Sequence, residues 1–225
     1  MDRNFRIRVL CGFGLFALAL LMMYTFEGIP FKIFFGVFAI ISGVELLSFF
    51  RQKISFLNVV LAIIEIIFLV CSSIYVARID VVHVWYLIFG VCGYDIFAYL
   101  CGKAIGGKIF KKSRPFPHIS KNKTWEGTIL GLTISTLLVL VLILVLRRTD
   151  YIYLACGPLA LIGDLFESFL KRRFKVKDSN EIVIKNKFFA KLELLVGGSE
   201  GHGGFLDRID SAAFAMTILL LFSLL

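Results

Sequence analysis

Long apolar runs, separated by short polar segments, make up most of the sequence. Seven of them approach the length of about 20 residues that a helix needs to cross a bilayer. They lie roughly at 7–24, 30–50, 54–77, 82–101, 126–146, 151–170 and 205–225. No small-residue cleavage site follows the first run, so we expect it to be retained rather than removed as a signal peptide. The pattern predicts an all-α fold, a polytopic integral membrane helical bundle of about seven transmembrane helices.

Polar residues enter two of the later runs at helical spacing. The run at 151–170 and its basic end place four of them on one helix face, at i, i+3, i+4 and i+7: Asp164, Glu167, Ser168 and Lys171. The last run repeats part of this spacing with Asp207, Asp210 and Ser211. Ionisable groups at membrane depth are costly, so they usually face a wet cavity or pair with one another. Two interpretations stay open: a functional polar stripe, or an ion pair of Lys171 with Asp164 or Glu167 that only holds helices together.

Two of these acids suit a metal ion. If the two helices face each other, Asp164 and Asp207 supply hard oxygen ligands from different elements, as Mg²⁺ prefers. Such an ion would polarise a phosphoryl group and orient it for attack. Neither aspartate has a close His or Cys partner, which argues against zinc.

The composition agrees with a membrane protein. Of the 225 residues, 59% are hydrophobic and only 18% are charged, more apolar than a soluble domain can bury in one core. The five cysteines show no CxxC or Cys/His spacing, so we expect packed, reduced thiols.

The formal net charge of +9 is unevenly distributed. If the N-terminus is cytoplasmic, the inner segments hold three Lys or Arg before the first run, two at 51–53, seven at 102–125 and eight at 170–204, whereas the outer segments hold four. The positive-inside rule favours this orientation, with both long loops cytoplasmic. We do not expect a nucleic acid partner, because the basic residues flank spans and carry no interleaved aromatic platform.

Two glycine-rich segments suggest a phosphate-bearing substrate. The loop at 102–125 is rich in lysine and glycine but lacks the Gly-Lys-Ser/Thr ending of a P-loop. The sequence GHGG at 201–204 is either a hinge or a loop whose backbone N–H groups approach phosphate at the start of a helix. Basic loops also attract anionic lipid headgroups. Combined with the acidic stripe, they indicate an anionic, phosphate-rich substrate.

Two segments carry most of the remaining polar pattern and read SFLKRRFKVKD at 168–178 and GHGGFLDRID at 201–210. They resemble the signature of the phosphatidate cytidylyltransferase (CDP-diacylglycerol synthase) family. The family pattern S-x-x-K-R-x₄-K-D, then H-G-G-x-x-D-R-x-D, is matched at every fixed position: Ser168, Lys171, Arg172, Lys177, Asp178, His202, Gly203, Gly204, Asp207, Arg208 and Asp210. GYDIFAYLCGKAIGG at 93–107 and ISKNKTWEG at 119–127 are similar to its supporting motifs.

The resemblance implies an enzyme of phospholipid biosynthesis that joins CTP and phosphatidate to give CDP-diacylglycerol and pyrophosphate. It implies Mg²⁺ held by Asp164 and Asp207, with a neighbouring K⁺ as a second ion. The residues expected to bind substrate phosphate are Ser120, Lys123, Thr124, Gly203 and Gly204. The residues expected to be catalytic are Ser168, Lys171, Arg172, Lys177, Asp178, His202, Arg208 and Asp210.

The expected partners are therefore CTP, phosphatidate and the lipid bilayer, and a homodimer stays open. We expect the bacterial inner (plasma) membrane, with the N-terminus and the active-site loops in the cytoplasm. Residues 1–80 would be generic transmembrane helices, and 81–225 would be the catalytic transmembrane region with cytoplasmic loops at 102–125 and 170–204.

The chain departs from the family pattern between the two signature segments. The 22 residues from Ser179 to Glu200 exceed the usual spacing, and the mixed apolar and basic stretch at 182–197 suits an amphipathic segment at the headgroup level. Two other functions remain as alternatives. One is a CTP-dependent polyprenol or isoprenoid-alcohol kinase, which would need a base for its alcohol. The other is a non-catalytic membrane transporter, which would predict inverted repeats in both halves.

Overall fold

The structure is a computed structural model, and it describes residues 21, 29–48, 55–111, 114–176 and 205–225. Within these ranges the regular elements are all helical. They are α2 (Ile29–Ser48), α3 (Phe56–Arg78), α4 (Val81–Leu87), a π-helical turn (Ile88–Cys92), α5 (Gly93–Ile105), α6 (Trp125–Val145), a 3₁₀ turn (Tyr151–Ala155), α7 (Cys156–Arg173) and α9 (Leu206–Ser223). The predicted all-α fold is confirmed.

Five helices are long and apolar enough to cross a membrane: Ile29–Ser48, Phe56–Arg78, Val81–Ile105, Trp125–Val145 and Tyr151–Arg173. Each begins and ends within a few residues of a predicted run. The sixth, α9, matches the run at 205–225 but carries Asp207, Arg208 and Asp210 in its first turns. The run at 7–24 lies outside the described residues, so the count of about seven stays a prediction.

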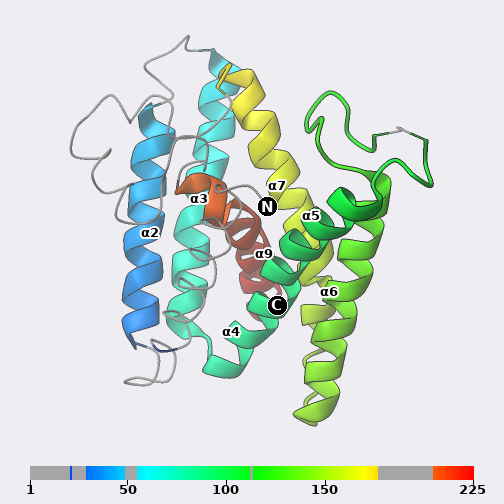
Figure 1. Cartoon of the computed structure of the whole chain (residues 1–225). Helices are drawn as coiled ribbons and strands as arrows, with labels where there is room; N and C mark the ends of the chain where they lie inside the picture. Colours follow the sequence, from blue (N-terminus) through cyan, green and yellow to red (C-terminus); the bar gives the residue numbers. More distant parts are fainter. Residues whose placement is uncertain (1–20, 22–28, 49–54, 112–113, 177–204) are drawn as a thin grey trace.

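The helices form a bundle in which α7 and α9 separate two pairs (Figure 1). On one side stand α2 and α3, and on the other stand α5 and α6 with the loop that joins them. Helix α9 packs mainly against α7 and α3, with a smaller contact to α2. The end of the chain that carries Asp207 is therefore surrounded by helices from both halves of the sequence.

Glycines allow two helix pairs, α5 with α6 and α7 with α9, to approach closely. The most extensive helix pair is α5 with α6, where a Cβ built on Gly131 would stand 2.8 Å from the Ala98 Cβ. One turn earlier, a Cβ on Gly127 would stand 2.5 Å from the Ala98 carbonyl oxygen. Small residues spaced by four are a recurrent means of bringing membrane helices together. Gly163 of α7 has the same role against α9, at Ser211 and Phe214.

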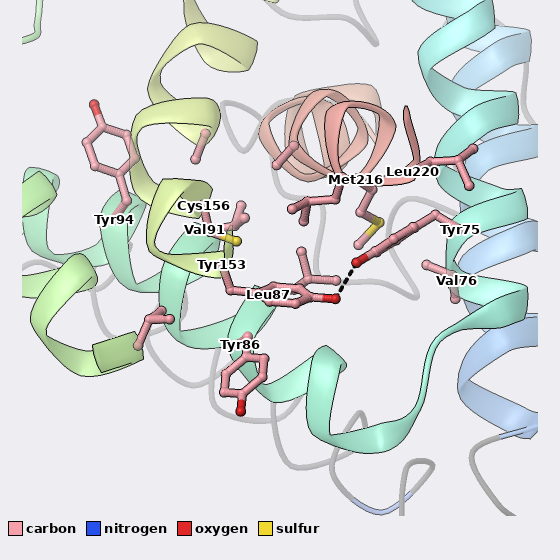
Figure 2. Close-up of a cluster of buried hydrophobic side chains, with 14 of the residues drawn as sticks. Tyr75, Val76, Tyr86, Leu87, Val91, Tyr94, Tyr153, Cys156, Met216 and Leu220 are labelled. Carbon is pink, nitrogen blue, oxygen red and sulfur yellow. Dashed lines mark hydrogen bonds between the residues drawn. The ribbon is translucent and has the colours of Figure 1, made fainter. Parts of the chain in front are cut away.

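One cluster of the buried core contains several tyrosines among aliphatic side chains (Figure 2). The Tyr75 and Tyr153 hydroxyls are hydrogen-bonded at 2.5 Å, which joins α3 to the 3₁₀ turn before α7. Tyr86 is fully buried beside Tyr153, with ring centroids 4.9 Å apart. A second buried cluster connects α2, α3, α7 and α9 through Leu46, Leu61, Leu170 and Leu206. Together the two clusters bury residues along most of α9.

Candidate active site

A cavity of about 650 Å³ lies where four helix ends converge. Its walls come from α5, α6, α7, α9 and the loop between α5 and α6. In Figure 1 the C-terminal ends of α5 and α7 and the N-terminal ends of α6 and α9 point to the same side of the bundle. Acidic and basic residues of the cavity wall are Asp95, Lys103, Arg114, Lys123, Asp164, Glu167, Lys171, Asp207 and Asp210.

Lys171 joins α7 to α9 inside this cavity. Its Nζ lies 2.6 Å from Glu167 Oε2 on the same helix and 3.0 Å from Asp207 Oδ1 on α9. Glu167 is only 1% exposed, so the ammonium group compensates a buried carboxylate. The polar stripe therefore forms an interhelical ion pair and also lines a cavity, so the two interpretations of the sequence hold together rather than exclude each other.

Asp164, the other acid of the stripe, pairs with a lysine from a different segment. Lys123, at the end of the α5–α6 loop, forms an ion pair with Asp164 Oδ2 and donates a hydrogen bond of 3.3 Å to the Tyr94 hydroxyl. Burial lowers the pKa of Lys123, but the Asp164 carboxylate and Tyr94 raise it, and the result lies above the ordinary value of 10.5. Lys123 is therefore cationic at neutral pH. Ser168 donates to Asp164 Oδ1 at 3.3 Å from the next turn of α7.

The α5–α6 loop is held by residues at the start of α6. The Thr124 hydroxyl accepts a hydrogen bond of 3.1 Å from the Gly127 N–H, which caps the helix. Glu126 Oε1 accepts the Ile109 and Phe110 N–H groups at 3.0 and 3.1 Å. These bonds fix both ends of a loop whose middle contributes Arg114, Ser120 and Asn122 to the cavity.

Most of the predicted site residues that the structure describes meet in this cavity. Those that line it are Ser120, Lys123, Thr124, Asp164, Lys171, Asp207 and Asp210. Three others are described but are not wall residues. Ser168 touches the site only through Asp164, Arg172 is exposed at the end of α7, and Arg208 is half-buried on α9. Lys177, Asp178, His202, Gly203 and Gly204 lie outside the described residues, as does the segment 179–200.

Several wall residues were not predicted as part of the site. Tyr94 and Asp95 belong to the segment 93–107, whose similarity to a family motif did not identify which side chains face inward. Arg114 and Asn122 were counted only as loop residues. Position along a loop carries no periodic signal, whereas helical spacing identified the stripe of α7. Glu167 was recognised as part of that stripe but not as a site residue.

The comparisons with known proteins agree with the motifs. A model described as the cytidylyltransferase family matches residues 77–184. A phosphatidate cytidylyltransferase of Rickettsia felis is 28% identical over 239 residues, which covers 99% of this chain and 94% of that protein. The enzyme of that name from Rickettsia typhi is 30% identical over 228 residues, covering 93% of this chain and 87% of its own length. One from Bacillus subtilis is 36% identical over 143 residues, which is 61% of this chain and 45% of the relative.

Proposed function

Because the chain belongs to the phosphatidate cytidylyltransferase family, we propose that it transfers the cytidylyl group of CTP to phosphatidate, giving CDP-diacylglycerol and pyrophosphate. One observation connects this proposal with particular residues. Asp164 and Lys171 of α7, Asp207 of α9 and Lys123 of the α5–α6 loop line one cavity, although they stand up to 84 positions apart in the chain. Lys171 and Asp207 belong to the two signature segments, and Lys123 belongs to the supporting segment 119–127. Asp164 was selected by its helical spacing in the polar stripe.

The reaction needs little covalent help from the protein. A phosphate oxygen of phosphatidate attacks the α-phosphorus of CTP, a new P–O bond forms, and the bond from the α-phosphorus to the bridging oxygen breaks. The electron pair of that bond leaves with pyrophosphate. The attacking oxygen is already ionised near pH 7, so no general base is required. Catalysis then consists of positioning the two phosphates and neutralising their charge.

The cationic wall residues suit these tasks. Lys171 places its ammonium group beside Asp207, and Lys123 places its own beside Asp164. Arg114 adds a guanidinium group from the loop. Arginine and lysine bind phosphate oxygens strongly where water is scarce. Thr124 and Ser120 add hydroxyl groups that donate to phosphate. We assign to Lys123, Lys171 and Arg114 the neutralisation of substrate phosphate, and to the hydroxyls its orientation.

The acids of the cavity fit a divalent cation. Carboxylates from two helices, Asp164 and Asp207, line it, and Glu167 Oε1 is a buried oxygen with no hydrogen-bond partner in the described part of the chain. The described residues contain no cluster of three His, Cys, Asp or Glu arranged to hold a metal without help. Mg²⁺ is usually held by one or two carboxylates together with water and substrate phosphate. We propose that Asp164 and Asp207 hold Mg²⁺, which when bound would neutralise charge at the α-phosphorus. A neighbouring K⁺ and a homodimer stay predictions.

The protein is an integral membrane protein, with five helices long and apolar enough to span. We propose that the cavity opens to the cytoplasm of a bacterial inner membrane. The Lys and Arg imbalance between the two sets of loops supports this orientation, because basic segments remain inside. A site at the membrane surface meets both a lipid and a water-soluble nucleotide.

One assay tests the reaction and separates it from the kinase alternative. Purified protein in detergent with Mg²⁺ is given phosphatidate, a polyprenol and CTP labelled either at the α- or at the γ-phosphate, and the lipid is then extracted. We expect α-label in the organic phase and γ-label in pyrophosphate. Transfer of γ-label to a polyprenol, or no transfer from either position, would contradict the proposal. The family relationship already disfavours the kinase and transporter alternatives.

A further inference from the structure

The first turn of α9 is held by a residue from the opposite end of the chain. Glu45 of α2 accepts the Phe205 N–H with Oε1 and the Leu206 N–H with Oε2, both at 3.0 Å. The partners are separated by 160 and 161 positions. Each carboxylate oxygen therefore meets one of two consecutive amide groups.

Helix α9 provides no cap from its own N-cap residue. That residue is Phe205, with helical backbone angles of −69° and −37°, and no side chain there accepts a backbone hydrogen bond. The first amide groups of a helix have no acceptor within the helix and need one from elsewhere. A carboxylate satisfies them and interacts favourably with the positive end of the helix dipole. Glu45 supplies this cap from a neighbouring helix.

The arrangement explains an acid inside an apolar span. Glu45 is only 2% exposed, and a buried carboxylate is costly unless it is paired or hydrogen-bonded. Phe205 also packs edge-on against Phe38 of α2, with ring centroids 4.9 Å apart. The start of α9 is thus attached to α2 by two hydrogen bonds and one aromatic contact.

This turn leads directly into the cavity. Asp207 follows Leu206, and Asp210 stands on the next turn, and both line the cavity. We infer that Glu45 is a positioning residue for the cytidylyl transfer: by capping α9 it fixes the height and rotation of Asp207 and Asp210 relative to Asp164. The inference rests on the proposed function and extends it, because it gives residues 1–80 a role in the site.

The test compares Glu45→Gln with a control variant that removes a different hydrogen bond between α9 and an N-terminal helix. Gln keeps the size of Glu but offers one acceptor for two amide groups. Thr217→Val is the control, since the Thr217 hydroxyl also joins α9 to an N-terminal helix by donating to the Phe68 carbonyl at 3.2 Å. Thr217 does not line the cavity and lies about two turns beyond Ser211, the last α9 residue of the cavity wall. We measure kcat, KM for CTP, the Mg²⁺ dependence and amide hydrogen exchange of residues 205–212.

For Glu45→Gln we expect kcat to fall on the order of ten- to a hundredfold, as misplacement of reacting groups commonly causes, with KM for CTP within about twofold. A higher Mg²⁺ concentration should be needed for half-maximal activity, and the amides of 205–208 should exchange faster. Thr217→Val should change neither the kinetic parameters nor the exchange rates. Unchanged kcat and exchange in Glu45→Gln, or an equal loss in Thr217→Val, would overturn the inference.

A second pair of variants covers the case in which Glu45→Gln does not fold. Phe205→Pro removes one of the two N–H donors but keeps the backbone, because its φ of −69° lies in the range of proline. Phe205→Leu loses the same aromatic ring and retains the donor. A lower kcat in the proline variant than in the leucine variant supports capping, and equal kcat contradicts it. If the wild type transfers no cytidylyl group, the proposed function fails, while hydrogen exchange still decides whether Glu45 caps α9.

Discussion

Lys123 and Lys171 stand between carboxylates that would otherwise repel one another. Lys123 pairs with Asp164, and Lys171 pairs with both Glu167 and Asp207. An ion pair in a partly buried site can stabilise the fold and can also hold charged groups in position to bind a substrate. Variants that change charge without changing shape separate the two contributions.

The first prediction concerns the proposed metal ligands. Asp164→Asn and Asp207→Asn should each lower kcat by at least about a hundredfold, because a lost metal carboxylate removes several kcal/mol of transition-state stabilisation. Both proteins should remain folded, since Asn keeps the shape and the hydrogen-bonding oxygen. Turnover and thermal unfolding in detergent measure the two effects. Asp80→Asn is the control, because Asp80 is exposed before α4 and its side chain makes no capping bond. Near-normal turnover in both variants would remove the metal assignment.

The second prediction separates structure from chemistry at Lys171. Lys171→Met leaves Glu167 as a buried carboxylate without its partner, which should cost about 3 kcal/mol or more of stability. In the double variant Lys171→Met, Glu167→Gln the charge on the fully buried Glu167 is gone, and only Asp207, which is more exposed, still lacks Lys171, so most of that stability should return. Activity should stay low in both, because the phosphate-binding cation is missing. Recovery of activity together with stability would show that Lys171 has only a structural role.

At the scale of helices, the sequence predicted lengths and ends well, because a span of apolar residues is bounded by the thickness of the bilayer. The helical spacing of Asp164, Glu167 and Lys171 also predicted their common face. Partners from distant segments could not be predicted. Nothing near Glu45 indicates that it caps a helix 160 positions away, and nothing in the α5–α6 loop indicates that Lys123 reaches Asp164. Such contacts depend on how helices pack, which a single sequence does not encode in any local pattern.

The third prediction tests the close packing of α7 on α9. A Cβ on Gly163 would stand 2.8 Å from the Phe214 Cβ and 3.0 Å from the Ser211 Cα, so Gly163→Ala must move the helices apart. Overpacking of this kind costs about 1–3 kcal/mol, and here it also separates Asp164 from Asp207. We expect a lower unfolding temperature and reduced kcat. Gly43→Ala of α2 is the matched control, because a Cβ there meets nothing within 4 Å. Equal behaviour of the two variants would show that this contact tolerates a methyl group.

At the scale of the whole molecule, the charges divide the protein into two ends. The α5–α6 loop and the C-terminal end of α7 are basic and border the cavity, whereas the α6–α7 connection at the other end carries Arg147, Arg148 and Asp150. A basic rim attracts both nucleotide and anionic lipid headgroups. The side of the membrane that the rim faces therefore decides whether cytoplasmic CTP reaches the site.

The last prediction is the orientation. In a cysteine-free variant, single cysteines at Lys108 and His118, both exposed in the α5–α6 loop, should react with a membrane-impermeant maleimide only after the cells are opened. A cysteine at Thr149, exposed beyond the other end of α6, should react in intact cells. The reason is the excess of Lys and Arg in the loops that border the cavity, since basic segments are retained in the cytoplasm. Labelling of Lys108→Cys in intact cells would contradict this orientation and the route by which CTP enters. Positions 118 and 149 flank α6, so they must lie on opposite sides of the membrane if α6 spans it. The result is therefore independent of the number of spans before α5.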